Sequence, residues 1–252
     1  MEIYFKNTFD EIGNATLFAT RFFKEIFKPS FEFKEFIRQC YFIGYKSLPL
    51  VTITGFIMGL VLTIQARPEM ARFGAESWIP GMVSLSLIRE IAPVITALIC
   101  AGKISSGIGA ELGSMKVTEQ IDAMEVAAIN PYRYLVVTRI LATTLMVPIL
   151  VFYAVFIGII GGYIGINMHN DVSITLYFSD SFKNVQFLDI FPATIKTFFF
   201  GFFIGMIGCF KGFNAKSGTE SVGKAANSAV VSASLSIFII DLIAVQLTDL
   251  FF

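Results

Sequence analysis

Charged residues are scarce in this chain of 252 residues: Asp, Glu, Lys and Arg together make up 15% of it, whereas hydrophobic residues make up 55%. Several apolar runs are long enough to cross roughly 30 Å of hydrocarbon, which excludes an ordinary soluble fold. The formal net charge of zero says little about partners, because the charged residues are distributed unequally between the two sides of the predicted membrane bundle. We expect no nucleic-acid partner.

Histidine and cysteine are nearly absent, which limits the chemistry available to the chain. Cys40, Cys100 and Cys209 are odd in number and far apart, so we interpret them as packing residues and expect neither a disulfide nor a metal site. His169 has no nucleophile or ligand set at a useful spacing, which favours a solvated loop residue. We therefore expect no enzyme activity and no cofactor bound by this chain.

Five apolar runs predict five membrane-spanning helices. They are Tyr45 to Gln65, Ile79 to Gly102, Ile140 to Asn167, Ile190 to Phe210 and Ala229 to Leu247. The expected fold is an all-α integral membrane protein forming one transmembrane domain, 1–252, with the five-span bundle at 45–252. Glycines recur in these runs at four-residue spacing, a pattern that lets helix backbones approach closely.

The segment 1–44 is amphipathic rather than apolar throughout. Its apolar residues recur near helical spacing between lysines and arginines: Leu17, Phe18, Phe22, Ile26 and Phe27. This pattern is typical of an N-terminal amphipathic interfacial helix, lying in the headgroup plane of a membrane. A cytoplasmic helix that packs on the protein's own core is the alternative.

Lysine and arginine gather on one side of the predicted bundle. They precede the first span and occupy the second-to-third and fourth-to-fifth connections, whereas the other side has only Arg67, Arg72 and Lys183. Because short cytoplasmic loops carry the excess of positive charge, we expect a cytoplasmic N-terminus and a periplasmic C-terminus.

Four charged residues fall inside the predicted spans, where an unpaired charge is costly. They are Arg89 and Glu90 in the second span, Lys196 in the fourth and Asp241 in the fifth. At about 1.5 Å per residue, all four fall in one layer roughly 10 to 15 Å below the outer surface. We pair Glu90 with Lys196 and Arg89 with Asp241. The layer is either a structural polar network or a contact for a charged or zwitterionic ligand, with a proton relay as a weaker alternative.

A short charged helix is predicted between the second and third spans, over Thr118 to Ala128, and Asn130-Pro131 stops it. Ile121 and Met124 share one face of this helix, and an apolar stripe with an acidic rim suits a groove on a partner. Folding back on the chain's own bundle is the alternative. The predicted coupling residues are Glu119, Gln120, Ile121, Asp122, Met124 and Glu125.

The string Gly218 to Lys224 matches the spacing of a phosphate-binding loop up to its last position, where Ala225 replaces the Ser or Thr that would hold magnesium. It also follows a membrane span rather than a strand. We therefore expect no nucleotide or magnesium site in this chain, and if energy comes from ATP, another subunit must bind the ATP and magnesium.

Several ordered motifs resemble one family, the MlaE/YrbE permeases of lipid-transporting ABC systems. The motifs are Leu87 to Leu98, Ala101-Gly102-Lys103, Ala110 to Met124 and Asn130-Pro131, within a match clearest from about Gly55 to Ala142. Lys103 stands where the family more often has Arg, and Asn130 where it more often has Asp.

This resemblance implies a permease in the bacterial inner membrane that moves phospholipid between the inner and outer membranes. It implies a homodimer with two ABC ATPase subunits on the cytoplasmic side and MCE-domain lipid-binding subunits on the periplasmic side. The implied lipid cavity would use the charged layer together with Leu62, Met70 and Phe73. An ion-coupled transporter working alone, or a membrane assembly subunit that moves nothing, is the alternative.

Overall fold

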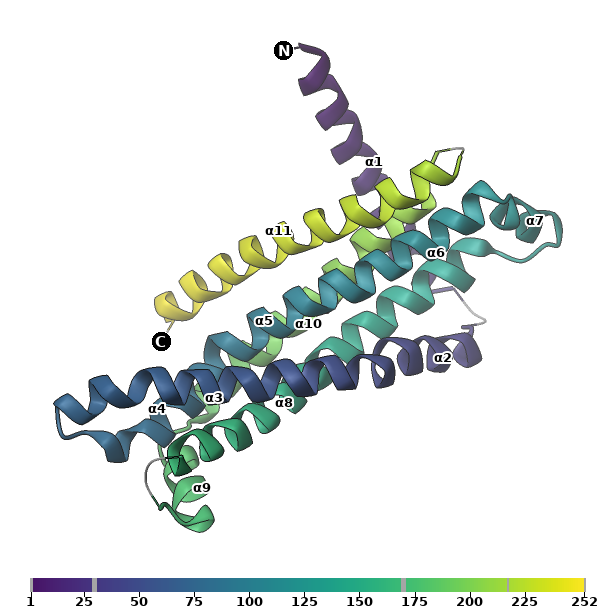
Figure 1. Cartoon of the computed structure of the whole chain (residues 1–252). Helices are drawn as coiled ribbons and strands as arrows, with labels where there is room; N and C mark the ends of the chain where they lie inside the picture. The colour runs from purple at the N-terminus through teal and green to yellow at the C-terminus, as the bar shows by residue number, and fades with distance from the viewer. Residues whose placement is uncertain (1, 29–30, 169–170, 217, 252) are drawn as a thin grey trace.

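The computed structural model describes residues 2–28, 31–168, 171–216 and 218–251, and Figure 1 shows them as a bundle of long helices. His169 lies outside the described residues. The α-helices are α1 (Glu2–Ile26), α2 (Phe33–Ile43), α3 (Leu48–Arg72), α4 (Ile79–Ser86), α5 (Ala92–Cys100), α6 (Ser106–Val117), α7 (Gln120–Val126), α8 (Thr138–Asn167), α9 (Ile174–Lys183), α10 (Phe187–Phe213) and α11 (Thr219–Phe251). Short 3-10 turns, η1 (Tyr45–Ser47) and η2 (Glu76–Trp78), and three π segments, η3 (Leu87–Ile91), η4 (Ala101–Ser105) and η5 (Tyr132–Val137), join or interrupt them.

Five helical stretches are long and apolar enough to cross a membrane, which confirms the all-α fold class and the predicted number of spans. They are Phe33–Arg72, Glu76–Val117, Tyr132–Asn167, Phe187–Phe213 and Thr219–Leu250. Each stretch extends beyond its apolar run at one or both ends, because backbone hydrogen bonding continues past the last apolar residue. The fourth stretch, for example, begins at Phe187 rather than at Ile190.

Glycines bring α3 and α8 into backbone contact. A Cβ atom added at Gly59 would lie 1.7 Å from the carbonyl oxygen of Gly158, and one at Gly161 would lie 2.2 Å from the carbonyl oxygen of Phe56. Real Cβ atoms cannot approach so closely, so only glycine permits this helix pair. The close approach predicted from the glycine spacing is confirmed here.

One face of α1 packs on the bundle. Phe18 and Phe22 are buried, and the Phe18 ring lies 5.0 Å from the ring of Tyr132, centroid to centroid. Leu17 and Phe23, on the other side of the helix, are exposed. Packing on the protein's own core, the alternative considered from the sequence, therefore holds for this face. The first half of α1 projects away from the bundle in Figure 1.

The two ends of the bundle are built differently. The main core runs along the spans, and a second apolar cluster, which includes Ile79, Val83 and Tyr177, lies where α4 and α9 meet. In Figure 1 α4 and α9 occupy one end of the bundle and α7 the other. We call these two ends of the bundle the α4–α9 end and the α7 end.

Candidate functional site

Lys196 is the centre of a charged cluster inside the bundle. Its ammonium group donates to Glu90 Oε2 at 2.7 Å and to Asp241 Oδ1 at 2.9 Å, and the side chain is only 4% exposed. The three residues belong to α10, η3 and α11. A buried cation persists only with partners, and here two carboxylates supply them. The predicted pairing of Glu90 with Lys196 is confirmed.

Arg89 has a different partner from the one predicted. Its Nε donates to Asp189 Oδ1 at 2.7 Å, and its Nη2 bonds to the same oxygen. The prediction that Arg89 pairs with Asp241 is wrong, because Asp241 is engaged by Lys196. Asp189 directly precedes the predicted fourth span, a position at which a carboxylate is expected to be solvated, but its side chain is 4% exposed and lies in the first turn of α10.

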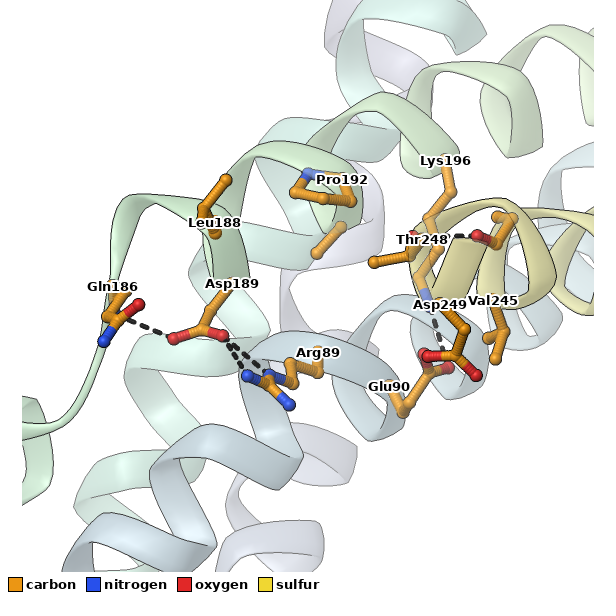
Figure 2. Close-up of a pocket in the computed structure, with 12 residues that line it drawn as sticks. Arg89, Glu90, Gln186, Leu188, Asp189, Pro192, Lys196, Val245, Thr248 and Asp249 are labelled. Carbon is orange, nitrogen blue, oxygen red and sulfur yellow. Dashed lines mark hydrogen bonds and ion pairs between the residues drawn. The ribbon is translucent and has the colours of Figure 1, made fainter. Parts of the chain in front are cut away.

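Asp189 has a second role at the start of α10. Its Oδ2 accepts a hydrogen bond from the backbone N–H of Gln186 at 2.7 Å, and the Gln186 side chain caps the Asp189 backbone in return. This reciprocal cap satisfies N–H groups that the first turn leaves free. One carboxylate therefore both begins α10 and holds Arg89 of the second span, as Figure 2 shows.

The neighbours Arg89 and Glu90 reach separate partners from a π segment, Leu87–Ile91. Adjacent residues on a helix point in well-separated directions, so Arg89 reaches Asp189 at the start of α10 and Glu90 reaches Lys196, about two turns further along the same helix. Single π turns inside α-helices occur frequently at functional sites. The irregular backbone thus coincides with the charged residues.

These groups line a cavity of about 480 Å³, here called the polar cavity (Figure 2). Its wall comes from the second span, the start of α10 and the end of α11: Arg89, Glu90, Gln186, Leu188, Asp189, Pro192, Ala193, Lys196, Ala244, Val245, Thr248 and Asp249. Sequence reasoning missed Asp189 and Asp249 as members of this site. Both lie at or beyond the edge of an apolar run, where a charge is ordinarily read as solvated.

The three apolar residues assigned to the lipid cavity are elsewhere in the single chain. Leu62 and Met70 pack against the apolar cluster of the α4–α9 end, and Phe73 is 81% exposed at the end of α3. None of them lines the polar cavity. Their assignment to a lipid site stays a prediction.

The predicted coupling segment forms the short helix α7, preceded by a left-handed residue, Glu119, with φ of 59°. Ile121 is 1% exposed and belongs to the main core, so it is not presented to a partner, contrary to expectation. Met124 is partly buried against that core. Val126 is an exposed large apolar side chain of α7, at 90%. The acidic residues Asp122 and Glu125 are exposed too, and Asp122 Oδ1 accepts a hydrogen bond from Lys116 at 2.8 Å.

The end of α1 is attached to the segment that follows α7. Glu25 accepts a hydrogen bond from Lys28 and another from Asn130 Nδ2 at 3.1 Å, and Arg133 Nη2 lies 3.6 Å from its carboxylate. The hydrogen bond and charge of Lys28, aided by Arg133 and Arg21, lower the pKa of Glu25 although burial opposes the shift. Asn130 Oδ1 also caps the backbone N–H of Tyr132 at 3.0 Å.

The string that approaches a phosphate-binding loop begins α11 at the surface. Gly218 has φ of +100°, and the Lys224 ammonium lies 2.7 Å from Glu220 Oε1, with both side chains exposed. This lysine therefore makes an ordinary surface ion pair between successive helical turns.

Comparison with known proteins identifies the family to which this chain belongs. The model of the family described as Permease MlaE matches residues 36–247. The chain belongs to the MlaE permease family. A relative from Rickettsia prowazekii named "Probable ABC transporter permease protein" is 38% identical over 96% of this chain and 92% of its own length. A Synechocystis relative with a similar name is 35% identical over 92% of this chain and 88% of its own.

A further MlaE relative carries a more specific name. The "Intermembrane phospholipid transport system permease protein MlaE" of Haemophilus influenzae is 33% identical over 82% of this chain and 80% of its own length. The present chain is thus an ABC-transporter permease and a multi-pass membrane protein, rather than a catalytic enzyme in its own right.

Proposed function

We propose that this permease moves phospholipid between the inner and outer membranes, from a position in the inner membrane, and that its polar cavity receives the lipid headgroup. The observation that carries the proposal is a cavity of about 480 Å³ lined by both signs of charge inside a bundle of membrane-spanning helices. Intramembrane charges are costly and mark substrate pathways. The name of the Haemophilus relative supports the choice of phospholipid.

The proposed assembly is a homodimer with two ABC ATPase subunits on the cytoplasmic side and MCE-domain subunits on the periplasmic side. The N-terminus and the α7 end would face the cytoplasm, and the C-terminus and the α4–α9 end the periplasm. This orientation is supported by the distribution of Lys and Arg along the sequence. A second copy would bring Leu62, Met70 and Phe73 into a shared lipid cavity.

The proposed ATPase contact is the exposed surface of α7 rather than its buried face. Val126 offers an apolar side chain that is 90% exposed, and the same short helix carries a polar border made of the exposed Glu125 and the Asp122–Lys116 ion pair. Apolar anchors with a polar rim are the usual form of a helix that docks in a groove. Ile121 would contribute indirectly, by fixing α7 on the bundle.

This contact is tested by Val126→Asp, with the co-expressed ATPase subunit purified alongside the permease. Burying an unpaired carboxylate costs enough to weaken binding by at least about ten-fold, so the ATPase should be lost while the permease still inserts. Thr219→Asp adds the same charge at an exposed helix start, where it is favourable, and should retain the ATPase. Equal retention by both variants would contradict the α7 contact.

The transport proposal is tested by lipid mass spectrometry on the purified complex and by ATP-dependent lipid transfer from proteoliposomes. We expect bound phospholipid and transfer that requires ATP. A complex that transfers lipid on an ion gradient without ATP, or that binds none, would favour the ion-coupled transporter or the assembly subunit.

A further inference from the structure

A second cavity lies next to the polar one, between α10 and α11. This apolar groove has a volume of about 440 Å³ and is walled by α10 and α11 alone. It includes Phe199, Ile243 and Leu247, and it shares four wall residues with the polar cavity: Pro192, Lys196, Ala244 and Thr248. A polar compartment therefore opens directly beside an apolar one, within a single copy of the chain.

The two compartments use adjacent faces of the same helices. On α10 the polar wall takes Asp189, Ala193 and Lys196, at intervals of four and three residues, whereas the groove takes Phe191, Ile195 and Phe199 at intervals of four. Residues so spaced lie above one another on a helix. A molecule spanning both compartments would need a charged end and a long apolar part.

The charges of the polar cavity distinguish among such molecules. Its wall contains two cations, Arg89 and Lys196, and three carboxylates, Glu90, Asp189 and Asp249. Lys196 is ion-paired with both Glu90 and Asp241, so two carboxylates compensate its charge and the wall offers little free positive charge at that point. Asp249 is exposed, and the Glu90 side chain is 46% exposed, so both can meet a positively charged group.

Arg89 is the available anion-binding group. Its bonds to Asp189 use Nε and Nη2, and the side chain is 57% exposed. Guanidinium groups bind phosphate well because they offer several donors in one plane. The cavity thus holds a phosphate-binding group at one position and an excess of carboxylates around it.

Building on the proposed function, we propose that this site selects a zwitterionic aminophospholipid over an anionic phospholipid. The phosphate contacts Arg89, the headgroup ammonium lies against Glu90 and Asp249, and one acyl chain occupies the apolar groove between α10 and α11. An anionic headgroup such as that of phosphatidylglycerol carries the same phosphate but no ammonium, so it makes no attraction to Glu90 and Asp249 that would offset their repulsion of the phosphate.

The test uses the intact complex in nanodiscs containing equal amounts of phosphatidylethanolamine and phosphatidylglycerol. A photo-crosslinking amino acid replaces Leu247, which lines the groove, and in a matched sample Leu242, which is equally on α11 and exposed but lines neither cavity. Mass spectrometry counts the two lipid adducts. We expect about three-fold enrichment of phosphatidylethanolamine at Leu247, the factor given by one partly exposed ion pair, and the bulk ratio at Leu242.

Asp249→Asn in the Leu247 crosslinking protein should lower the enrichment toward the bulk ratio, whereas Asp249→Glu should preserve it. A bulk ratio or an excess of phosphatidylglycerol at Leu247 would overturn the inference. ATP-dependent transfer of both lipids, measured on the unmodified complex, separates the two claims. Transfer without selectivity at Leu247 removes only the inference, and absence of any transfer removes the proposed function.

Discussion

Replacing Lys196 by methionine is expected to destabilise the permease more than replacing either of its partners. The Lys196 side chain is 4% exposed and its ammonium group bonds to both Glu90 and Asp241, so Lys196→Met leaves two carboxylates near one another without a cation. Breaking a buried ion pair from one side costs about 3 kcal/mol. For a chain of this size that corresponds to a fall in Tm of about 9 °C.

Glu90→Gln should cost only about 1 kcal/mol, because Lys196 keeps Asp241 and the glutamine can still accept a hydrogen bond. The triple change Lys196→Met, Glu90→Gln and Asp241→Asn removes every charge of the cluster and should be more stable than Lys196→Met alone. Thermal unfolding of the detergent-solubilised protein measures all of these variants. Lys224→Met, which breaks a surface ion pair, is the control and should change little. A fall in Tm for Lys196→Met no larger than that for Lys224→Met would refute the stabilising role of the buried ammonium group, and so would a triple variant as unstable as Lys196→Met alone.

Three further predictions concern helix packing and the attachment of α1. Gly59→Ala places a Cβ atom 1.7 Å from Gly158 O and should lower Tm strongly, whereas Gly223→Ala, which meets nothing within 4 Å, should not; equal effects would contradict the α3–α8 contact. Asn130→Asp loses the donor to Glu25 and sets two carboxylates together, so hydrogen exchange in α1 should quicken, and adding Glu25→Gln should restore it. Folding lowers the pKa of Glu25. Its ionised carboxylate therefore stabilises the attachment of α1 fully above the usual carboxyl pKa, and this stabilisation is lost as the pH falls through the lowered pKa. Hydrogen exchange in α1 should therefore quicken in acid, and much less so in Glu25→Gln.

The span count and the Glu90–Lys196 pair were predictable because they depend on strong signals. Apolar runs of twenty residues have no other stable environment, and a lysine in the fourth span needs a carboxylate at the same depth. The Arg89 partner was missed because Asp189 lies just before the apolar run that begins at Ile190. Its seven-residue spacing from Lys196, two helical turns, was the signal that could have identified it.

Burial at the α7 end was harder to predict. Ile121 and Met124 show the periodicity of a docking helix, and that periodicity is the same whether the apolar face meets a partner or the chain's own core. In the structure Ile121 packs in the chain's own core. Arg139 is a similar case: it reads as a loop cation beside an apolar run, yet it is 1% exposed, with its guanidinium bonded to Leu135 O at 3.0 Å and Glu111 Oε1 at 2.8 Å. Tertiary contacts, which sequence periodicity does not contain, fix both residues.

The position of the polar cavity follows from how α10 begins. Because Asp189 caps the first turn, its carboxylate is held at a fixed point of the helix, and the next residues on that face, Pro192 and Ala193, are small or lack a long side chain. Two helical turns further along, Lys196 bonds to Glu90 of the second span and to Asp241 of the fifth span. Charges at both ends with short residues between them leave a space that no side chain of α10 fills. The seven-residue spacing of Asp189 and Lys196 thus links the second, fourth and fifth spans and also leaves the polar cavity between them. A substitution of Lys196 that changes stability should therefore also change what the polar cavity binds.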